Sequence, residues 1–309
     1  MEQLIILVGP TASGKTAWGI SLAQELGGAV ISADSRQVFA GFNIGTAKPK
    51  AAWHDDTHEV LTPDVVDGID HYLLNIQQPD QPYILAQWQR AAYQAIDHVQ
   101  HNNLTPLLVG GTMLYADSII FNYHIPAVPP NEQLRTELSA IPAEDLYQKL
   151  IAQDPAAAAF IEPHHQQRII RALEVMATTN QPFSISRRKS TPRYKIKTIG
   201  LFPGWETLTK NITERALAMF DGELLDEVKQ LRERFGPSLP LLNTMNYKQA
   251  AALLDKKISR EDALQETISI NVRYAHRQMS WWKNRDDITW LDPKVTNTHT
   301  SIFKELNKK

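Results

Sequence analysis

The chain has 309 residues, of which 43% are hydrophobic and 21% are charged, and it contains 18 prolines and 14 glycines. This length predicts about two domains, or one large domain with an insertion, and the composition excludes a disordered or collagen-like chain. The absence of cysteine excludes a disulfide framework, a thiolate zinc site, an iron–sulfur cluster and a cysteine nucleophile. These features favour a globular protein of the reducing cytoplasm.

The net charge of −2 conceals an asymmetry along the chain. Residues 1–182 carry 9 Lys and Arg against 19 Asp and Glu, whereas residues 183–309 carry 23 against 15. The C-terminal part therefore has a net charge of +8 and is suited to contact a polyanion. Lysines collected on solvated helix faces would produce the same balance, so charge alone leaves both interpretations open.

The first predicted elements are a strand, a loop and a helix. The apolar run 3–8 predicts a short buried strand, and residues 15–26 have the apolar spacing of a helix that ends at Gly27 and Gly28. The N-terminus lacks a basic segment and meets Pro10 directly after the apolar run, so no signal peptide is predicted. No later apolar stretch approaches the ~20 residues of a membrane span, and we expect no membrane contact.

Short apolar strands alternate with helices in the rest of the chain. Strands are predicted at 29–33, 105–109 and 195–202, and helices at 84–99, 206–235, 247–254 and 260–284. This alternation predicts an α/β fold with a parallel sheet flanked by helices. Residues 123–186 show no strand pattern and instead predict helices at 131–140, 143–153, 155–161 and 166–178. We therefore predict a core of residues 1–122 and 187–309 with an inserted small helical domain, 123–186.

A phosphate-binding motif lies between the first strand and the first helix. It is the G-x-x-x-x-G-K-[ST] sequence formed by Gly9, Pro10, Thr11, Ala12, Ser13, Gly14, Lys15 and Thr16. The backbone amides of such a loop and the positive end of the following helix bind a di- or triphosphate, Lys15 adds a cation, and the Thr16 hydroxyl is a ligand for Mg²⁺. The motif predicts a bound phosphate chain without specifying the reaction.

Asp34 is the acidic residue at a predicted strand end, beside the phosphate loop. It is a candidate metal ligand or general base, and a purely structural cap on the next helix is the alternative. A hydrolase of this class would place a further carboxylate after another strand, but residues 105–109 continue into Gly110, Gly111 and Thr112. The sequence therefore disfavours nucleotide hydrolysis.

Six further motifs extend along the chain in order, and together with the phosphate loop they resemble the tRNA dimethylallyltransferase family, also called tRNA isopentenyltransferases. They are ISADSRQVF (31–39), NIGTAKP (43–49), IDHYLLNI (69–76), VGGTMLY (109–115), QQRIIRALEV (166–175) and RYAHRQMSWWK (273–283). The sequence departs from the family pattern at several positions, including Asn75, Met113, His165, Asn180 and Asn211, the last of which stands where an arginine is common.

The resemblance implies transfer of a dimethylallyl group from dimethylallyl diphosphate to the exocyclic amine of the adenosine 3′-adjacent to a tRNA anticodon. It implies Asp34 as the base, Thr112 as its assistant, and Lys15 with Mg²⁺ on Thr16 as the groups that stabilise the departing diphosphate. The partner would be the tRNA anticodon stem-loop, with the adenine flipped out of the stack. The implied tRNA-binding residues are Asp34, Ser35, Arg36, Gln37, Thr112, Gln167, Arg168, Ile169, Ile170 and Arg171.

Two basic segments are further candidates for tRNA contact. The densest basic run comprises Arg187, Arg188, Lys189, Arg193, Lys195 and Lys197, and a solvated loop is its alternative. The last long predicted helix mixes cations with aromatic rings at Arg273, Tyr274, His276, Arg277, Trp281, Trp282, Lys283 and Arg285. Such a mixture suits stacking on single-stranded nucleic acid, although we expect at least one of its tryptophans to belong to the core.

Two histidine pairs have the spacing of metal ligands without a convergent partner in sequence. His54 and His58 are four residues apart, and His164 and His165 are adjacent. We predict surface positions for them rather than metal sites. The alternative functions for the whole chain are a small-molecule kinase with a phosphate loop and a non-catalytic RNA-binding paralogue. A monomer is expected because no exposed apolar segment is evident in the sequence.

Overall fold

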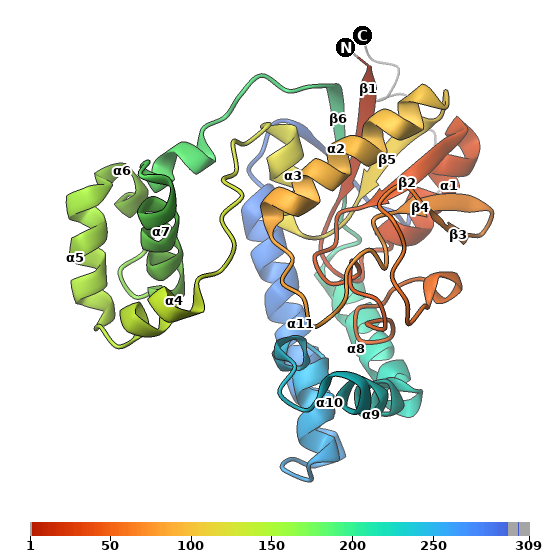
Figure 1. The fold of residues 1–309 in the computed structure, drawn as a ribbon. Coiled ribbons are helices and arrows are strands. Elements are labelled where there is room, and N and C mark those ends of the chain that lie inside the picture. Colours follow the sequence, from red (N-terminus) through yellow and green to blue (C-terminus); the bar gives the residue numbers. More distant parts are fainter. Residues whose placement is uncertain (1, 296–301, 303–309) are drawn as a thin grey trace. The chain divides into compact units, whose positions relative to one another are not determined.

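A computed structural model describes residues 2–295 and residue 302 (Figure 1). The chain divides into two compact units. The first, which we call the core unit, comprises residues 1–81, 91–116 and 193–309, and the second, the helical unit, comprises residues 82–90 and 117–192. The helical unit thus contains the whole of the segment 123–186 predicted as an insertion. The predicted core segment 187–309 extends beyond residue 295 into a part mostly outside the described residues.

The core unit is built on a seven-stranded sheet in the order β3-β4-β2-β5-β1-β6-β7. All neighbouring strands are parallel except β3 and β4, which form an antiparallel hairpin at one edge. The predicted parallel sheet is therefore confirmed apart from this hairpin. The strands are β1 (Gln3–Val8), β2 (Gly28–Ser32), β3 (Asp64–Val66), β4 (Ile69–Tyr72), β5 (Thr105–Val109), β6 (Lys195–Leu201) and β7 (Ile288–Leu291).

β1 lies near the middle of the sheet, hydrogen-bonded to β5 on one side and β6 on the other. Leu4 to Val8 are all buried, as expected for a strand covered on both faces. The helix α1 (Lys15–Leu26) packs Leu22 and Ala23 against alternate side chains of the sheet, including Ile5 and Leu7. This packing fixes the loop between β1 and α1 at the carboxyl edge of the sheet.

The remaining helices of the core unit follow the apolar spacing of the sequence with one exception. The predicted helix 206–235 is wrong as a single element, because the chain leaves the helical conformation at Gly222 and starts again two residues later. Two helices are divided between the units: α2 (Leu85–His101), which begins in the helical unit, and α3 (Met113–Ile120), which ends in it. The other helices are α8 (Trp205–Asp221), α9 (Leu224–Phe235), α10 (Tyr247–Leu254) and α11 (Arg260–Trp282), with 3-10 turns η1 (Lys50–Ala52) and η3 (Pro240–Asn243).

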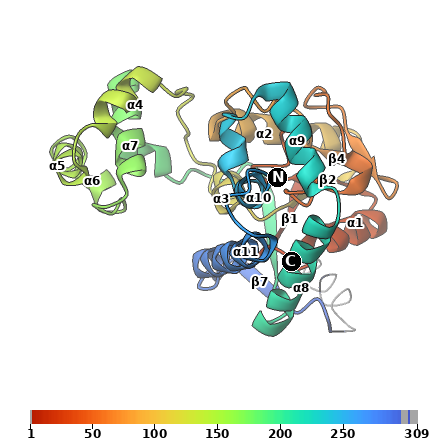
Figure 2. The ribbon, with the colours of Figure 1, turned by 90° about the horizontal axis from the view of Figure 1, so that it is seen from below.

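α11 is amphipathic, with a buried row that runs along its length. The row includes Thr267, Asn271, Ala275 and Gln278, which recur every three or four residues. The helix begins with a capping box between Ser259 and Asp262. α8 and α11 pack against each other through Leu208, Ile212 and Ala275 (Figure 2).

The helical unit has its own hydrophobic core. Its helices are α4 (Glu132–Ser139), α5 (Ala143–Gln153), α6 (Pro155–Ala158) and α7 (Gln166–Thr179), followed by the 3-10 turn η2 (Phe183–Arg187). Leu146 and Leu150 of α5 pack against Ile169 and Leu173 of α7 in this core. Within the described residues, no helix of either unit is both long and apolar enough to cross a membrane.

Candidate functional site

The candidate site is a cavity of about 420 Å³ in the core unit. It lies where β1, β2 and β5 end, at the carboxyl edge where parallel sheets bind their ligands. Five segments supply its walls: the phosphate loop, the residues after β2, the residues after β5, the helix α8 and the helix α11. The lining residues are Thr11, Ala12, Gly14, Lys15, Thr16, Ala17, Asp34, Gln37, Thr46, Ala47, Val109, Gly110, Gly111, Asn211, Arg215, Tyr274 and Gln278.

The loop between β1 and α1 has the backbone shape that its glycines predict. Gly14 is the N-cap of α1 and has a φ of 88°, a left-handed conformation that glycine adopts without strain. Ala12 also has a positive φ, 62°. The Lys15 Nζ donates to the Pro10 carbonyl at 2.7 Å, and Thr16 is exposed to the cavity. The N-terminus of α1 therefore faces the cavity with a cation beside it.

Two cations with lowered pKa values lie at the cavity. Burial, reinforced by the nearby Arg215 guanidinium and opposed by the Asp34 carboxylate, lowers the pKa of Lys15 to about 7. Burial likewise lowers the pKa of Arg215 to about 10, against the opposing effect of Asp34. An anionic ligand would raise both pKa values again, because it favours the charged forms of both side chains. The electrostatics of the cavity therefore suit a phosphate chain.

Arg215 is a site residue that the sequence analysis missed. Its Nη2 donates to the Thr11 hydroxyl at 2.8 Å and to Asn271 Oδ1 at 3.2 Å. Asn211, one turn earlier on α8, lines the same cavity and donates to the Ala12 carbonyl at 3.0 Å. The spacing of four residues was the available signal, since positions i and i+4 share a helix face. Arg215 thus provides a cation on the helix face where Asn211 provides none.

Asp34 has both a structural role and an open side. Its Oδ1 accepts from the backbone amides of Arg36, at 2.8 Å, and Gln37, at 3.4 Å, so the carboxylate stabilises a turn. The expected cap on the next helix is wrong, because no helix begins at this point of the chain. Both bonds end on Oδ1, and no hydrogen bond within the described residues reaches Oδ2. Asp34 also lines the cavity, which means that the structural and the chemical interpretations of this carboxylate are compatible.

Thr112 lies beside Asp34, as the motifs predict. Its Oγ1 accepts from the Ser35 backbone amide at 3.0 Å and donates to the Ser35 hydroxyl at 3.3 Å. Its own amide donates to the Ala33 carbonyl at 3.2 Å. The ends of β2 and β5 therefore hold the segments of Asp34 and Thr112 together, although Asp34 lines the cavity and Thr112 does not.

Gln278 is a second site residue that the sequence analysis missed, although it lies within one of the quoted motifs. Its side chain is 1% exposed. The Thr11 amide donates to Gln278 Oε1 at 2.7 Å, and Gln278 Nε2 donates to the Gly111 carbonyl at 2.7 Å. A Cβ on Gly111 would lie 2.5 Å from that Nε2, so any larger residue would displace the Gln278 amide. α11 thus ties the phosphate loop to the loop after β5.

The segment 43–47 is held by the buried carboxylate of Glu227 on α9. Glu227 accepts from the backbone amides of Asn43, Ile44 and Gly45 and from the Tyr247 hydroxyl at 2.6 Å. Burial raises the pKa of Glu227, and these hydrogen bonds oppose the rise. In turn, Gln37 Nε2 donates to the carbonyls of Thr46 and Ala47 at 3.2 and 3.3 Å. The Gln37 side chain is therefore fixed in the cavity wall, while Arg36 is exposed.

The residues predicted on α7 belong to the helical unit. Gln167 and Arg168 are exposed, but Ile169 and Ile170 are 0% and 4% exposed in the core of that unit. Arg171 pairs with the Glu174 carboxylate and donates to the Val128 carbonyl at 2.8 Å. The prediction that the side chains of Ile169 and Ile170 contact tRNA is therefore wrong, because both side chains are packed in the core of the helical unit. Gln167 and Arg168 remain available.

Several side chains of the two predicted basic segments pack on aromatic rings or in the core. In the basic run, Lys189 lies over the Phe121 ring at 3.9 Å and Arg193 lies over the Tyr93 ring at 3.8 Å. On α11, Trp282 is fully buried, which confirms that one tryptophan belongs to the core. The exposed His276 stacks on Trp205 with ring centroids 3.8 Å apart.

His54 and His58 converge on one buried carboxylate. Their Nε2 atoms lie 2.9 and 3.1 Å from the two oxygens of Asp64, whose side chain is 2% exposed. The hydrogen bond to Asp64 raises the pKa of His58, against the effect of burial. Asn75 also donates to Asp64, at 3.1 Å, and receives a bond from the buried Lys48. This network holds the loop after β2 and offers no open metal position.

Comparisons with known proteins agree with the motifs. The family model described as IPP transferase matches residues 37–285, and one described as isopentenyl transferase matches residues 2–64. A protein of Synechococcus sp. (strain JA-3-3Ab) named tRNA dimethylallyltransferase is 38% identical over 303 residues, which cover 98% of this chain and 86% of that protein.

Solved structures resemble the chain over nearly its whole length. The tRNA isopentenylpyrophosphate transferase of Bacillus halodurans is 32% identical, with a TM-score of 0.69 and coverage of 99% and 97%. A eukaryotic dimethylallyltransferase acting on tRNA is 24% identical with a TM-score of 0.80, which shows a shared fold. On the extent of the family match and the identity to its relatives, this chain belongs to the IPP transferase family.

Proposed function

We propose that this chain transfers a dimethylallyl group from dimethylallyl diphosphate to tRNA. The acceptor would be the exocyclic amine of the adenosine 3′-adjacent to the anticodon. One observation carries the proposal: a phosphate loop with Lys15 and a carboxylate with an unused oxygen, Asp34, line the same cavity. A diphosphate leaving group and an amine acceptor need these two kinds of residue on opposite sides of one carbon atom.

The donor's diphosphate would occupy the phosphate loop. The amides at the start of α1, the Lys15 ammonium and the Arg215 guanidinium would hold its oxygens. As the bond between carbon 1 of the prenyl group and oxygen breaks, its electron pair passes to the diphosphate, and these cations stabilise the developing charge. This explains how a motif best known for nucleotides can serve a prenyl donor.

The acceptor side would be served by Asp34 and Thr112. The adenine amine forms a bond to carbon 1 and loses one proton, for which Asp34 Oδ2 is the acceptor. The bonds on Asp34 Oδ1 keep the carboxylate in place through this step. Thr112, two residues beyond Gly110, would orient the amine or the neighbouring Ser35 hydroxyl. The products are the prenylated adenosine and diphosphate, with the proton on Asp34.

We also propose Mg²⁺ as the metal ion of this cavity. This ion prefers oxygen ligands and is usually bound through one or two protein groups together with phosphate oxygens. Thr16 lines the cavity at the first turn of α1, and within the described residues no hydrogen bond engages its hydroxyl. Thr16 would hold the ion next to the diphosphate, where it would add positive charge at the leaving group.

We place tRNA contacts at Ser35, Arg36 and Gln37 beside the cavity and at Gln167, Arg168 and Arg171 on α7. The positive charge of the C-terminal part supports a polyanionic partner. We further propose that the enzyme acts in the cytoplasm as a monomer. A small-molecule kinase and a non-catalytic RNA-binding protein are the alternatives that the experiment must separate.

The test uses radiolabelled dimethylallyl diphosphate and unmodified tRNA. We expect label in the tRNA with the wild-type chain. The Asp34→Asn variant keeps an oxygen that can accept from the Arg36 and Gln37 amides but cannot take up the proton. It should bind tRNA with unchanged affinity and transfer label at a rate reduced at least ~10²-fold.

A matched control is Asp67→Asn, a carboxylate in the turn between β3 and β4 that does not line the cavity. It should transfer label at the wild-type rate. Phosphate transfer from ATP to a small acceptor would instead favour the kinase. Retained tRNA binding without any label transfer by the wild-type chain would favour the non-catalytic paralogue.

A further inference from the structure

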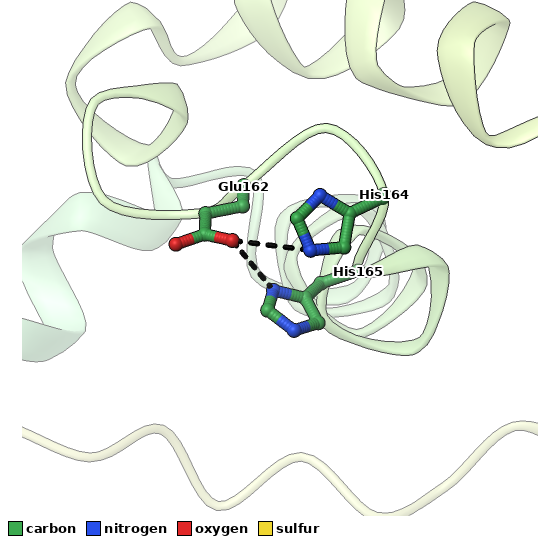
Figure 3. A group of neighbouring side chains, drawn as sticks. All are labelled: Glu162, His164 and His165. Carbon is green, nitrogen blue, oxygen red and sulfur yellow. Dashed lines mark ion pairs between the residues drawn. The ribbon is translucent and has the colours of Figure 1, made fainter.

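A cluster of metal-ligating side chains lies in the helical unit, in the turn that precedes α7 (Figure 3). It consists of Glu162, His164 and His165, all exposed. One ligand atom from each residue lies within 4.8 Å of the others, and within the described residues this is the one group of three His or acidic residues that meets this condition. Nothing in the proposed transfer reaction uses these side chains.

The distances within the cluster are close to those between two ligands of one transition-metal ion. His164 Nε2 lies 3.1 Å from Glu162 Oε2, and His165 Nδ1 lies 3.7 Å from the same oxygen. Two ligand atoms at ~2.0–2.1 Å from a tetrahedral zinc ion are roughly 3.3 Å apart. The observed separations lie on either side of this value. A metal ion could therefore replace the proton between imidazole and carboxylate with small side-chain rotations.

The backbone that carries the three ligands is already fixed. The His165 amide donates to the Glu162 carbonyl at 3.0 Å, which closes the turn. Ile161, 4% exposed, and Ile169, 0% exposed, anchor both ends of the turn in the core of the helical unit. Less conformational entropy is therefore lost when a metal binds than in a flexible segment.

The imidazole of His165 does not cap the helix that follows it. His165 is the N-cap residue of α7, yet its side chain makes no capping hydrogen bond. The start of a helix carries partial positive charge, which opposes a cation, and the Glu162 carboxylate offsets this charge. The combination of two imidazoles and one carboxylate matches the preferences of zinc and similar divalent ions rather than those of Mg²⁺ or Ca²⁺.

We propose that Glu162, His164 and His165 form a binding site for a zinc-like divalent transition-metal ion at the start of α7. Three protein ligands leave at least one further position for water. Metal binding would also tie the first turn of α7 to the preceding residues, which opposes fraying of the helix at that end.

The experiment is calorimetric titration of the full-length chain, without a histidine tag, with ZnCl₂ at about pH 7.5. We expect one saturable site that is weakened at least tenfold by His164→Ala, by His165→Ala and by Glu162→Gln. His124→Ala is the matched control, because His124 is an exposed histidine of the same unit outside the cluster. Cobalt(II) should give visible absorption bands of a low-symmetry site in the wild type that these three variants lose.

Two results would overturn the proposal. One is the absence of saturable zinc binding up to about 1 mM free metal. The other is binding that survives His164→Ala but is lost in His58→Ala, which would place the metal at the Asp64 network. The three cluster residues are exposed, so each variant should keep the wild-type thermal midpoint, and this measurement separates loss of a ligand from loss of folding.

Discussion

Lys15 illustrates how one residue can be poised for its ligand. In the free site its pKa is about 7, against an ordinary value of 10.5, because burial and Arg215 disfavour the charged form. Between these two values the free side chain is largely neutral in the folded protein, and a bound diphosphate would restore its charge. Ligand binding and proton uptake at this residue are therefore linked.

We predict that diphosphate binding weakens as the pH rises above about 7. Below about pH 7 Lys15 is charged before and after binding, whereas above it each bound diphosphate should bring a proton to Lys15. The dissociation constant should therefore increase with pH above 7. Calorimetry at pH 8 in buffers of different ionisation enthalpy would measure the uptake.

Lys15→Arg is the control, because a guanidinium stays charged at this pH. Protons exchanged by diphosphate itself are common to both proteins and cancel in the comparison. Equal proton uptake by the wild type and by Lys15→Arg would contradict the lowered pKa of Lys15.

At the scale of the elements, α11 completes the site through Gln278. Replacing Gln278 with Leu would leave the Thr11 amide without its partner, which costs about 1–3 kcal/mol for a buried group. The Gly111 carbonyl would lose its shorter bond and keep the one from the Tyr274 hydroxyl at 3.3 Å. We expect the phosphate loop to become less ordered, with KM for the prenyl donor raised about tenfold and kcat changed less. Steady-state kinetics with varied donor would measure this difference.

Ser280→Ala provides the comparison on the same helix, since Ser280 is exposed two residues further on. It should leave both constants unchanged. A variant Gln278→Leu with normal KM and a uniformly lower yield of folded protein would assign Gln278 a structural role alone.

The predictable elements are those with local signals. The strand 3–8, the helix 15–26 and the phosphate loop were predicted with the observed bounds, because apolar periodicity and glycine positions specify them over short distances. The β3–β4 hairpin was missed although its turn, Asp67-Gly68, is a strong hairpin signal in which both residues have positive φ. The three-residue length of β3 hid the alternation that usually accompanies this signal.

The missed site residues depend on contacts between distant segments. Asp34 and Thr112 follow strands and carry motifs, and so they could be placed at the sheet edge. Arg215 and Gln278 reach the cavity only because α8 and α11 pack beside the phosphate loop, 200 or more positions away in sequence. Their helix spacing indicates a buried face but not which residue of that face meets the ligand.

The molecule as a whole combines two units with different kinds of stability. The core unit rests on a sheet buried on both faces, whereas the helical unit contains an ionic centre at Glu174, whose side chain is 0% exposed. Burial alone would raise the pKa of Glu174, but hydrogen bonds from Arg135, the Asn131 amide and Arg171 lower it to about 2. The helical unit should therefore lose stability when Glu174 becomes protonated in acid.

The direction of this pH effect on stability follows from the linkage between protonation of Glu174 and folding. A carboxylate with a pKa of about 2 in the folded state and 4.5 otherwise contributes stability above pH 4.5 and loses it as the pH falls toward 2. Hydrogen exchange should show α7 losing protection in this range before β1 does. Glu174→Gln should lower the free energy of unfolding of the helical unit by roughly 3 kcal/mol at neutral pH and remove the pH dependence.

Glu137→Gln, an exposed position on α4, is the control and should behave as the wild type. Simultaneous loss of protection in α7 and β1 over this pH range would show that the two units unfold as one.

The bridge from Gln278 to Thr11 also bears on biosynthesis. The phosphate loop precedes α11, which supplies the bridging amide, by more than 200 positions in the sequence, so it is synthesised before α11. A nascent chain can therefore form β1 and α1 before its phosphate loop is tied to α11. We expect the loop to gain its full order, and with it its affinity for the prenyl donor, only once α11 has been synthesised.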